Sequence, residues 1–151
     1  MRKFILFWCM AILLLDTGWV VALDASDENP EKGTLKVVIT GMQNEKGDVI
    51  VALFSSKESF EGNGPEFQSV RVEISGKRSE CEFSNIPFGV YAVKVFHDEN
   101  GNGKLDKNAM GQPRERYGFS NNVRNLFGPA GYSEAKFSFE KVDMVIGITL
   151  K

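Results

Sequence analysis

The clearest alternation of apolar and polar side chains in this chain runs from Thr34 to Thr40, in the stretch TLKVVIT. Leu35, Val37 and Ile39 share one phase, and the polar side chains fall in the other. Successive side chains of a β-strand point to opposite faces. The spacing therefore predicts a strand with one face buried in a core.

Six further runs are predicted as strands. Residues 48–54 are apolar in both phases, so this strand is expected to be covered on both faces. Alternate positions of residues 142–150 form a five-member apolar face. The remaining runs are residues 70–74, 80–84, 91–95 and 135–139. Seven short strands with almost no helical periodicity predict an all-β fold, a seven-stranded antiparallel sandwich of immunoglobulin or transthyretin-like type.

The first 22 residues have the layout of a secretory signal peptide. Arg2 and Lys3 precede an apolar run from Phe4 to Leu15, and small residues follow up to a cleavage point after Ala22. A membrane-spanning helix needs about 20 apolar residues, so the run is short for an anchor, although an uncleaved anchor remains the alternative. The sequence thus predicts an extracytoplasmic protein, periplasmic or secreted. It also predicts a flexible lead-in at residues 23–32 and one domain over residues 33–151.

Charge and cysteine content narrow the possible partners. The 151 residues carry 18 basic and 20 acidic side chains, a formal net charge of −2. A nucleic-acid surface would need a basic excess, so no nucleic-acid partner is expected, and membrane contact is expected only through the signal peptide. Without the leader, Cys81 is the only cysteine, which excludes an intramolecular disulfide. Its phase within residues 80–84 predicts a buried thiol.

The densest run of oxygen-bearing side chains and glycines is HDENGNGKLDKN, residues 97–108. A twelve-position calcium loop supplies oxygen ligands from positions 1, 3, 5, 7, 9 and 12 and has glycine at position 6. Counted from Asp98, position 6 is Gly103 and position 7 offers the Lys104 carbonyl. The predicted calcium ligands are Asp98, Asn100, Asn102, Lys104 and Asp106.

Two departures limit this calcium prediction. Position 12 is Ala109 where a bidentate Glu is expected, so water or another side chain such as Glu115 has to complete the shell. The flanking residues 91–96 are predicted as a strand, whereas a calcium-sensing loop lies between helices. The site is therefore expected to be weak and structural. The alternative is an Asn/Gly-rich turn whose side chains cap backbone groups without an ion.

A long segment, residues 97–133, contains no convincing strand. Loops of this length inside a compact domain are usually functional or disordered, and the aromatic residues here favour an ordered loop packed on the sandwich. Residues 109–132 are expected to bind a protein or glycan partner of the cell envelope. Candidate ligand or partner residues are Arg114, Arg116, Tyr117 and Arg124. For the arginines, internal pairing with Glu115 and Asp106 is the favoured expectation, because the segment has much irregular backbone to satisfy.

Catalysis has no positive support in the sequence. His97 is the only histidine, and its neighbour Asp98 should point to the opposite face of the strand, so the two do not form a dyad. His97 is expected at the rim of the core. The leading interpretation is a non-catalytic protein with structural calcium. The alternatives are a small enzyme or carbohydrate-binding protein that uses the Arg/Tyr-rich loop, and a subunit of an envelope assembly.

Several motifs resemble one bacterial family. They are VKVFHDENGNGKLD at 93–106, GQP at 111–113, YGFSNN at 117–122, FGP at 127–129 and PFGVY at 87–91. Over about residues 33–151 the chain resembles the domain-of-unknown-function family 2141. The resemblance implies a signal-bearing extracytoplasmic β-sandwich without an assigned role, and it carries over no catalytic residues. The loop alone also resembles the calcium loops of β-sandwich repeats in bacterial surface proteins.

Overall fold

The computed structural model describes residues 31–125 and 128–151. The predicted signal peptide, residues 1–22, lies outside the described residues, as does most of the predicted lead-in. Lys32, expected to close that lead-in, is already the first residue of a strand. In the described part of the chain, no helix has both the length and the apolar character needed to cross a membrane.

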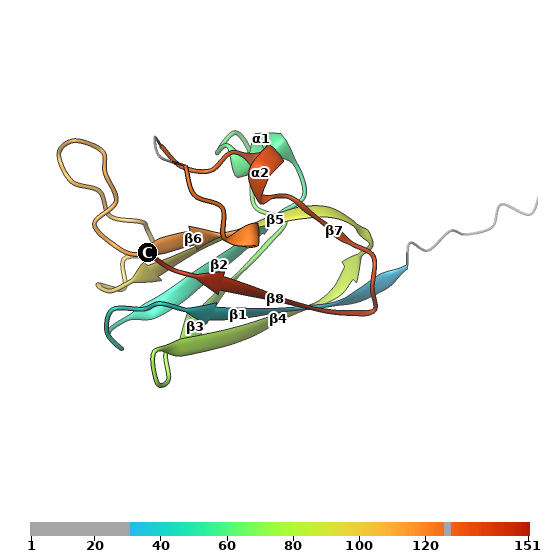
Figure 1. Cartoon of the computed structure of the whole chain (residues 1–151), viewed down its shortest axis with the longest axis horizontal. Coiled ribbons are helices and arrows are strands. Elements are labelled where there is room, and N and C mark those ends of the chain that lie inside the picture. Colours follow the sequence, from blue (N-terminus) through green and yellow to red (C-terminus); the bar gives the residue numbers. More distant parts are fainter. Residues whose placement is uncertain (1–30, 126–127) are drawn as a thin grey trace, which may run out of the picture.

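The described residues form two β-sheets with short helices on one side (Figure 1). The first sheet has the order β4-β1-β8, with bounds Arg78–Pro87, Lys32–Thr40 and Asp143–Thr149. The second has the order β3-β2-β5-β6, with bounds Gln68–Glu73, Asp48–Phe54, Gly89–Asp98 and Tyr117–Phe119. β7 (Phe137–Phe139) pairs with the start of β5. The helices are α1 (Lys57–Phe60), η1 (Ser120–Asn122) and α2 (Tyr132–Ala135).

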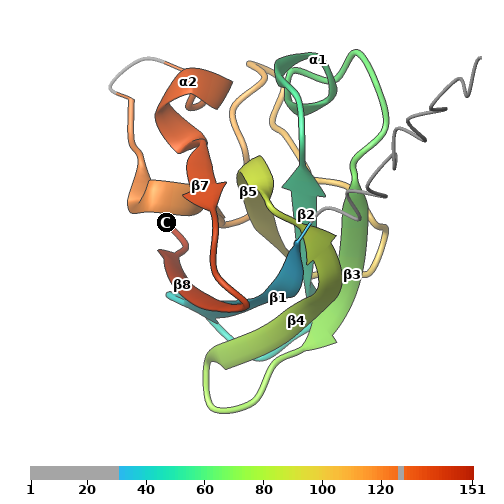
Figure 2. The same cartoon turned by 90° about the vertical axis from the view of Figure 1, so that its right-hand side faces the viewer.

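The main core lies between the two sheets. The predicted alternation of β1 is confirmed, because its burial switches at every position from Gly33 onward. Each member of the central set is at most 1 % exposed. These residues are Leu35, Val37, Ile39, Val49, Val51, Leu53, Val93 and Val95. Figures 1 and 2 show β1, β4 and β8 along one side of the molecule and α1 and α2 together on the opposite side.

Three features of the strand prediction need correction. The described residues contain eight strands and not seven, because β6 lies inside the segment predicted to lack a strand, and its three residues are too few to show alternation. β7 begins at Phe137, since Ala135 belongs to α2. The sheets are not purely antiparallel, because β1 and β8 pair in parallel. The all-β class and the two-sheet arrangement are confirmed, and the immunoglobulin or transthyretin type stays a prediction.

One polar side chain joins the two sheets at the edge formed by η1 and β8. The Asn122 amide donates to the carbonyl of Gly147 at 3.0 Å, and its Oδ1 accepts from the Thr149 N–H at 2.8 Å. Next to it, the backbones of Tyr117 and Lys151 exchange two hydrogen bonds of 3.1 and 3.2 Å. The edge of β8 nearest β6 is therefore paired at its C-terminal end.

Candidate functional site

The predicted ion loop, residues 98–106, begins where β5 ends. Asp98 is the last residue of β5 and is fully buried. Its carboxylate accepts the backbone N–H groups of Asn102 and Gly103 at 3.1 and 2.7 Å. One nitrogen of the Arg71 guanidinium lies 3.3 Å from the same carboxylate. The charge of Asp98 is therefore compensated by protein groups.

Three of the predicted calcium ligands converge on one point of the ion loop. The side-chain amides of Asn100 and Asn102 donate to the two oxygens of Asp106, at 2.6 and 3.0 Å. The amide oxygens face backbone N–H groups instead: Asn100 accepts from Asn102, and Asn102 accepts from Lys104. These contacts are Asx turns, in which a side chain holds the backbone two residues further on.

Glu115 has a different place from the one expected. The sequence offers it as a side chain that completes the calcium shell, yet one oxygen accepts the N–H of Glu99 at 2.9 Å and the other accepts the N–H of Asp106 at 3.0 Å. The side chain is only 8 % exposed. Glu115 therefore braces the two ends of the ion loop against each other.

The ion loop satisfies part of what a calcium site requires. Within residues 31–125 and 128–151, no three His, Cys, Asp or Glu side chains form a group that could hold a metal. The loop instead offers two carboxylates and two amides, which are oxygen donors of the kind that calcium prefers. The two amide N–H groups now point at Asp106, where a cation would have to sit. Half a turn of each amide would present oxygen there and would break the two Asx turns, so a cation would have to replace those hydrogen bonds, and the donor set then fits only a weak site.

Arg71 is a functional candidate that the sequence did not reveal. Its guanidinium donates to Asp48 at 3.0 Å as well as approaching Asp98. A cation bound at Asp98 in the ion loop would therefore lie near the Arg71 guanidinium, which already neutralises that carboxylate. Arg71 comes from β3, the partner of β2, and no local spacing links it to the loop.

His97 is fully buried at the end of β5 and contacts neither cavity described below. Its Nε2 lies 2.6 Å from the carbonyl of Lys46, and its Nδ1 lies 3.8 Å from a carboxylate oxygen of Glu99. Among the described residues, that Nδ1 has no hydrogen-bond partner. The position agrees with the structural role expected for His97 and leaves the ring remote from any open surface.

The four predicted ligand or partner residues do not come together. Arg116 donates to the carbonyl of Gly41 at 3.0 Å, so it pairs internally, although with a backbone group and not with Glu115 or Asp106 as expected. The Arg114 side chain is exposed, while its N–H binds the carbonyl of Asp106. Only Tyr117 and Arg124 line a common cavity.

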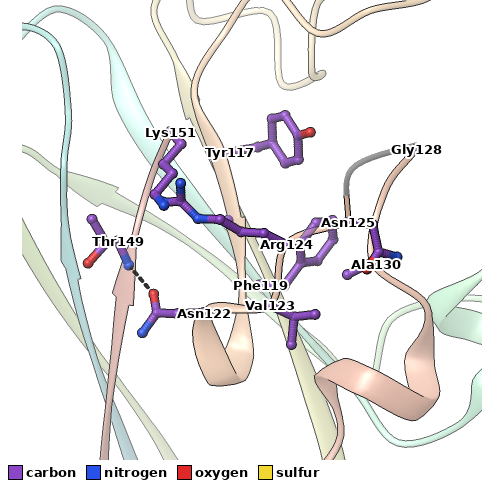
Figure 3. A pocket seen from close by; sticks show the side chains of 11 residues that line it. Tyr117, Phe119, Asn122, Val123, Arg124, Asn125, Gly128, Ala130, Thr149 and Lys151 are labelled. Atoms are coloured by element: carbon purple, nitrogen blue, oxygen red, sulfur yellow. Dashed lines mark hydrogen bonds between the residues drawn. The ribbon is translucent and has the colours of Figure 1, made fainter.

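That cavity has a volume of about 220 Å³ and lies beside η1 and the end of β8 (Figure 3). Its polar lining includes Asn122, Arg124, Thr149 and Lys151. Two of these side chains are basic, and the described lining contains no acidic one. The cavity could accept a small polar or anionic group.

A larger cavity of about 990 Å³, here called the sheet groove, lies on the outer face of the second sheet. Two rows of cross-strand neighbours form its floor, Ile50-Phe96-Tyr117 and Ala52-Lys94-Phe119. One wall is built from Gly103, Leu105, Lys107 and residues 111–113. The apolar outward phase of residues 48–54 was expected to be covered, and in the structure part of it faces this groove.

The chain matches a family model described as an uncharacterised protein conserved in bacteria, DUF2141, over residues 37–146. Searches among curated proteins and among solved structures find no match. The family is the one that the motifs around residues 93–122 resemble. Its description assigns no activity.

Proposed function

The chain belongs to the uncharacterised bacterial family DUF2141, and on that premise we propose that it is a non-catalytic extracytoplasmic binding protein. In this proposal the ion loop holds a structural calcium ion, and residues 109–132, here called the binding segment, contact a protein or glycan partner of the cell envelope. The two parts are linked through Asp106, which ends the ion loop and whose carbonyl accepts the N–H of Arg114.

The observation that carries the calcium proposal is the convergence of Asn100 and Asn102 on the carboxylate of Asp106. Three oxygen-bearing side chains with the spacing of a calcium loop meet at one point, and the backbone N–H of Asn102 binds the buried carboxylate of Asp98. The ligands would be Asp98, Asn100, Asn102, Asp106 and the Lys104 carbonyl. A bound calcium would hold the first part of the long loop and so fix where the binding segment starts.

The exposure of the binding segment supports a partner role. Met110 is 83 % exposed at the tip of the loop, and residues 111–114 next to it are exposed as well. An exposed Met is flexible and polarisable, a common property of protein-binding surfaces. The segment therefore offers an apolar tip beside the positive charge of Arg114.

The surroundings of the two reactive side chains support the absence of catalysis. His97 is fully buried beneath the loop. Cys81 is 9 % exposed, and its burial raises the pKa of the thiol to about 11, so little thiolate exists at neutral pH. Neither side chain is available to a substrate in this conformation.

Carbohydrate binding is the second candidate, and one observation favours it. Tyr117 and Arg124 line the same small cavity, so an aromatic ring and a guanidinium border one space. An enzyme or sugar site that uses all the predicted residues is less well supported, because Arg116 already donates a hydrogen bond to the Gly41 carbonyl. The candidate sugar site is thus limited to the cavity beside η1.

Thermal melting of the chain in calcium and in a chelator tests the leading proposal. Several millimolar calcium should raise the melting temperature of the wild type, because an ion that binds only the folded state stabilises it. Asp106→Asn keeps the shape of the side chain but removes a charge, and it should abolish the rise. Glu82→Gln changes an exposed acid on β4 and should leave it intact. An identical wild-type melting temperature in calcium and in chelator would refute the calcium site.

A further inference from the structure

The floor of the sheet groove is an apolar surface that the fold leaves uncovered. Ile50, Ala52 and Phe96 are each partly exposed on the outer face of the sheet, although they lie on its central strands. Together with Phe119 they line the cavity of about 990 Å³. Large concave apolar surfaces with a few polar groups are the usual form of small-molecule sites.

One cation lies within this apolar floor. Lys94 is the cross-strand neighbour of Ala52 on one side and Phe119 on the other. Its ammonium lies 4.1 Å from the ring centre of Phe60 and 5.1 Å from that of Phe54, and it donates to the carbonyl of Phe60. Burial lowers the pKa of this ammonium, which is the expected effect of removing a cation from water.

Lys94 has no carboxylate partner within ion-pair distance in the part of the chain that the structure describes. An ammonium has three donors, and the Phe60 carbonyl takes one of them. Glu61 offsets this half-buried charge only from beyond ion-pair distance, and an anion bound directly to the ammonium would relieve more of the cost of burial. The groove is therefore complementary to a ligand that has both a negative group and an apolar body.

The other charged residues on the groove confine the negative group of such a ligand to Lys94. Glu61 and Glu66 line it, but Glu61 lies 3.8 Å from Lys57, and Glu66 accepts a hydrogen bond from Ser69. Lys107 is the one other basic side chain of the lining, so besides Lys94 the groove carries two acids and one base. A negative group is therefore favoured only in direct contact with the Lys94 ammonium.

We infer that the sheet groove binds a small anionic amphiphile, such as a medium- or long-chain carboxylate, with its charged group at Lys94 and its chain along Ile50 and Phe96. This inference rests on the part of the proposed function that gives binding to residues 109–132, because residues 111–113 and Phe119 line the groove. It does not depend on calcium.

Calorimetric titration with two probes of equal chain length tests the inference. Decanoate and nonyltrimethylammonium have the same nine-carbon alkyl tail and opposite charges, and both are used below their micelle concentrations. Wild type should bind decanoate about tenfold or more tightly than the ammonium probe, since a charge-assisted contact is gained with only one of them. Equal affinities, or no binding of decanoate, would overturn the inference without any variant.

A matched pair of variants locates the charge. Lys94→Met keeps the length and apolar stem of the side chain. It should weaken the affinity for decanoate about tenfold and leave the affinity for the ammonium probe unchanged or higher. Lys141→Met removes an exposed cation outside the groove and should leave both affinities unchanged. Equal weakening of decanoate binding by Lys141→Met and Lys94→Met, or no weakening by Lys94→Met, would reject the assignment.

Repeating the titration in chelator separates this inference from the proposed calcium site. Decanoate binding that persists in chelator supports the groove even where the melting experiment refutes calcium. Absence of decanoate binding in both buffers refutes the groove, and it leaves a calcium-dependent melting temperature unaffected.

Discussion

At the scale of single residues, Glu115 shows how one buried side chain can hold a loop. It accepts the backbone N–H groups of Glu99 and Asp106, which lie on opposite sides of the ion loop. A donor that loses its partner inside a protein keeps the full cost of leaving water. The loop therefore depends on a side chain that lies beyond its own C-terminal end.

Replacement of Glu115 by Ala should lower the free energy of unfolding by about 1–3 kcal/mol, because two backbone donors lose their acceptor. Urea denaturation of the two proteins in chelator measures the difference. Glu82→Ala, an exposed acid on β4, is the control and should change the stability by less than about 0.5 kcal/mol. Equal effects of the two substitutions would contradict the bracing role.

Arg71 bears on the same loop through charge. Its guanidinium, 3.3 Å from the carboxylate of Asp98, should compete with any cation bound there. Arg71→Met is expected to have a lower melting temperature than the wild type in chelator. Calcium should raise the melting temperature of the variant by more than it raises that of the wild type. Arg78→Met removes an exposed arginine that pairs with Glu80 and should leave the calcium response unchanged. A smaller calcium response in Arg71→Met would show that Arg71 does not compete.

At the scale of elements, the edge between η1 and β8 depends on one amide. Asn122 has a φ of 51°, a left-handed conformation that Asn tolerates better than most residues, and its side chain binds two backbone groups of β8. The Asn122 side chain thus forms the hydrogen bonds to β8 that a neighbouring strand would otherwise form.

Asn122→Ala should destabilise the protein and speed hydrogen exchange at Gly147 and Thr149. Asn85 offers a matched control, because it is also exposed and has a φ of 58°. Asn85→Ala reports the cost of the backbone conformation alone, and Asn122→Ala should cost roughly 1–2 kcal/mol more, for the two hydrogen bonds. Equal costs and unchanged exchange in β8 would mean that the amide does not join the sheets.

The elements that local pattern predicts are those whose own residues decide their structure. β1 alternates over its whole length, so its face could be read directly from the sequence. β6 has three residues, and its pairing with β5 is set by the long loop that returns it there. The parallel pairing of β1 with β8 leaves no local mark, because either direction buries the same alternate residues.

The candidate sites divide in the same way. The polar loop itself could be predicted because its oxygen-bearing side chains are spaced along one stretch, from Asp98 to Asp106. Arg71 and the buried setting of Lys94 depend on neighbours from other strands, Asp48 and Phe54 among them. Such contacts arise only when the sheet is assembled, and no spacing in the chain encodes them.

At the scale of the whole molecule, Cys81 reports on the integrity of the core. Its thiol has a pKa of about 11 when buried, against an ordinary value of 9.0, so at pH 8 the thiolate is about a hundredfold scarcer than in an unfolded chain. Iodoacetamide should therefore modify Cys81 slowly in buffer and rapidly in urea. Peptide mapping distinguishes it from Cys9. Fast modification of Cys81 without denaturant would indicate an open core.

The parallel pairing of β1 and β8 has a consequence for the order in which the protein can fold. Thr40 and Thr149 are hydrogen-bonded across a separation of 109 positions. Contacts between such distant parts of a chain are slow to form, and they cannot form while the later part is still being made or moved. Both edges of β1, the strand whose alternation is clearest in the sequence, can therefore be paired only after nearly the whole chain is present.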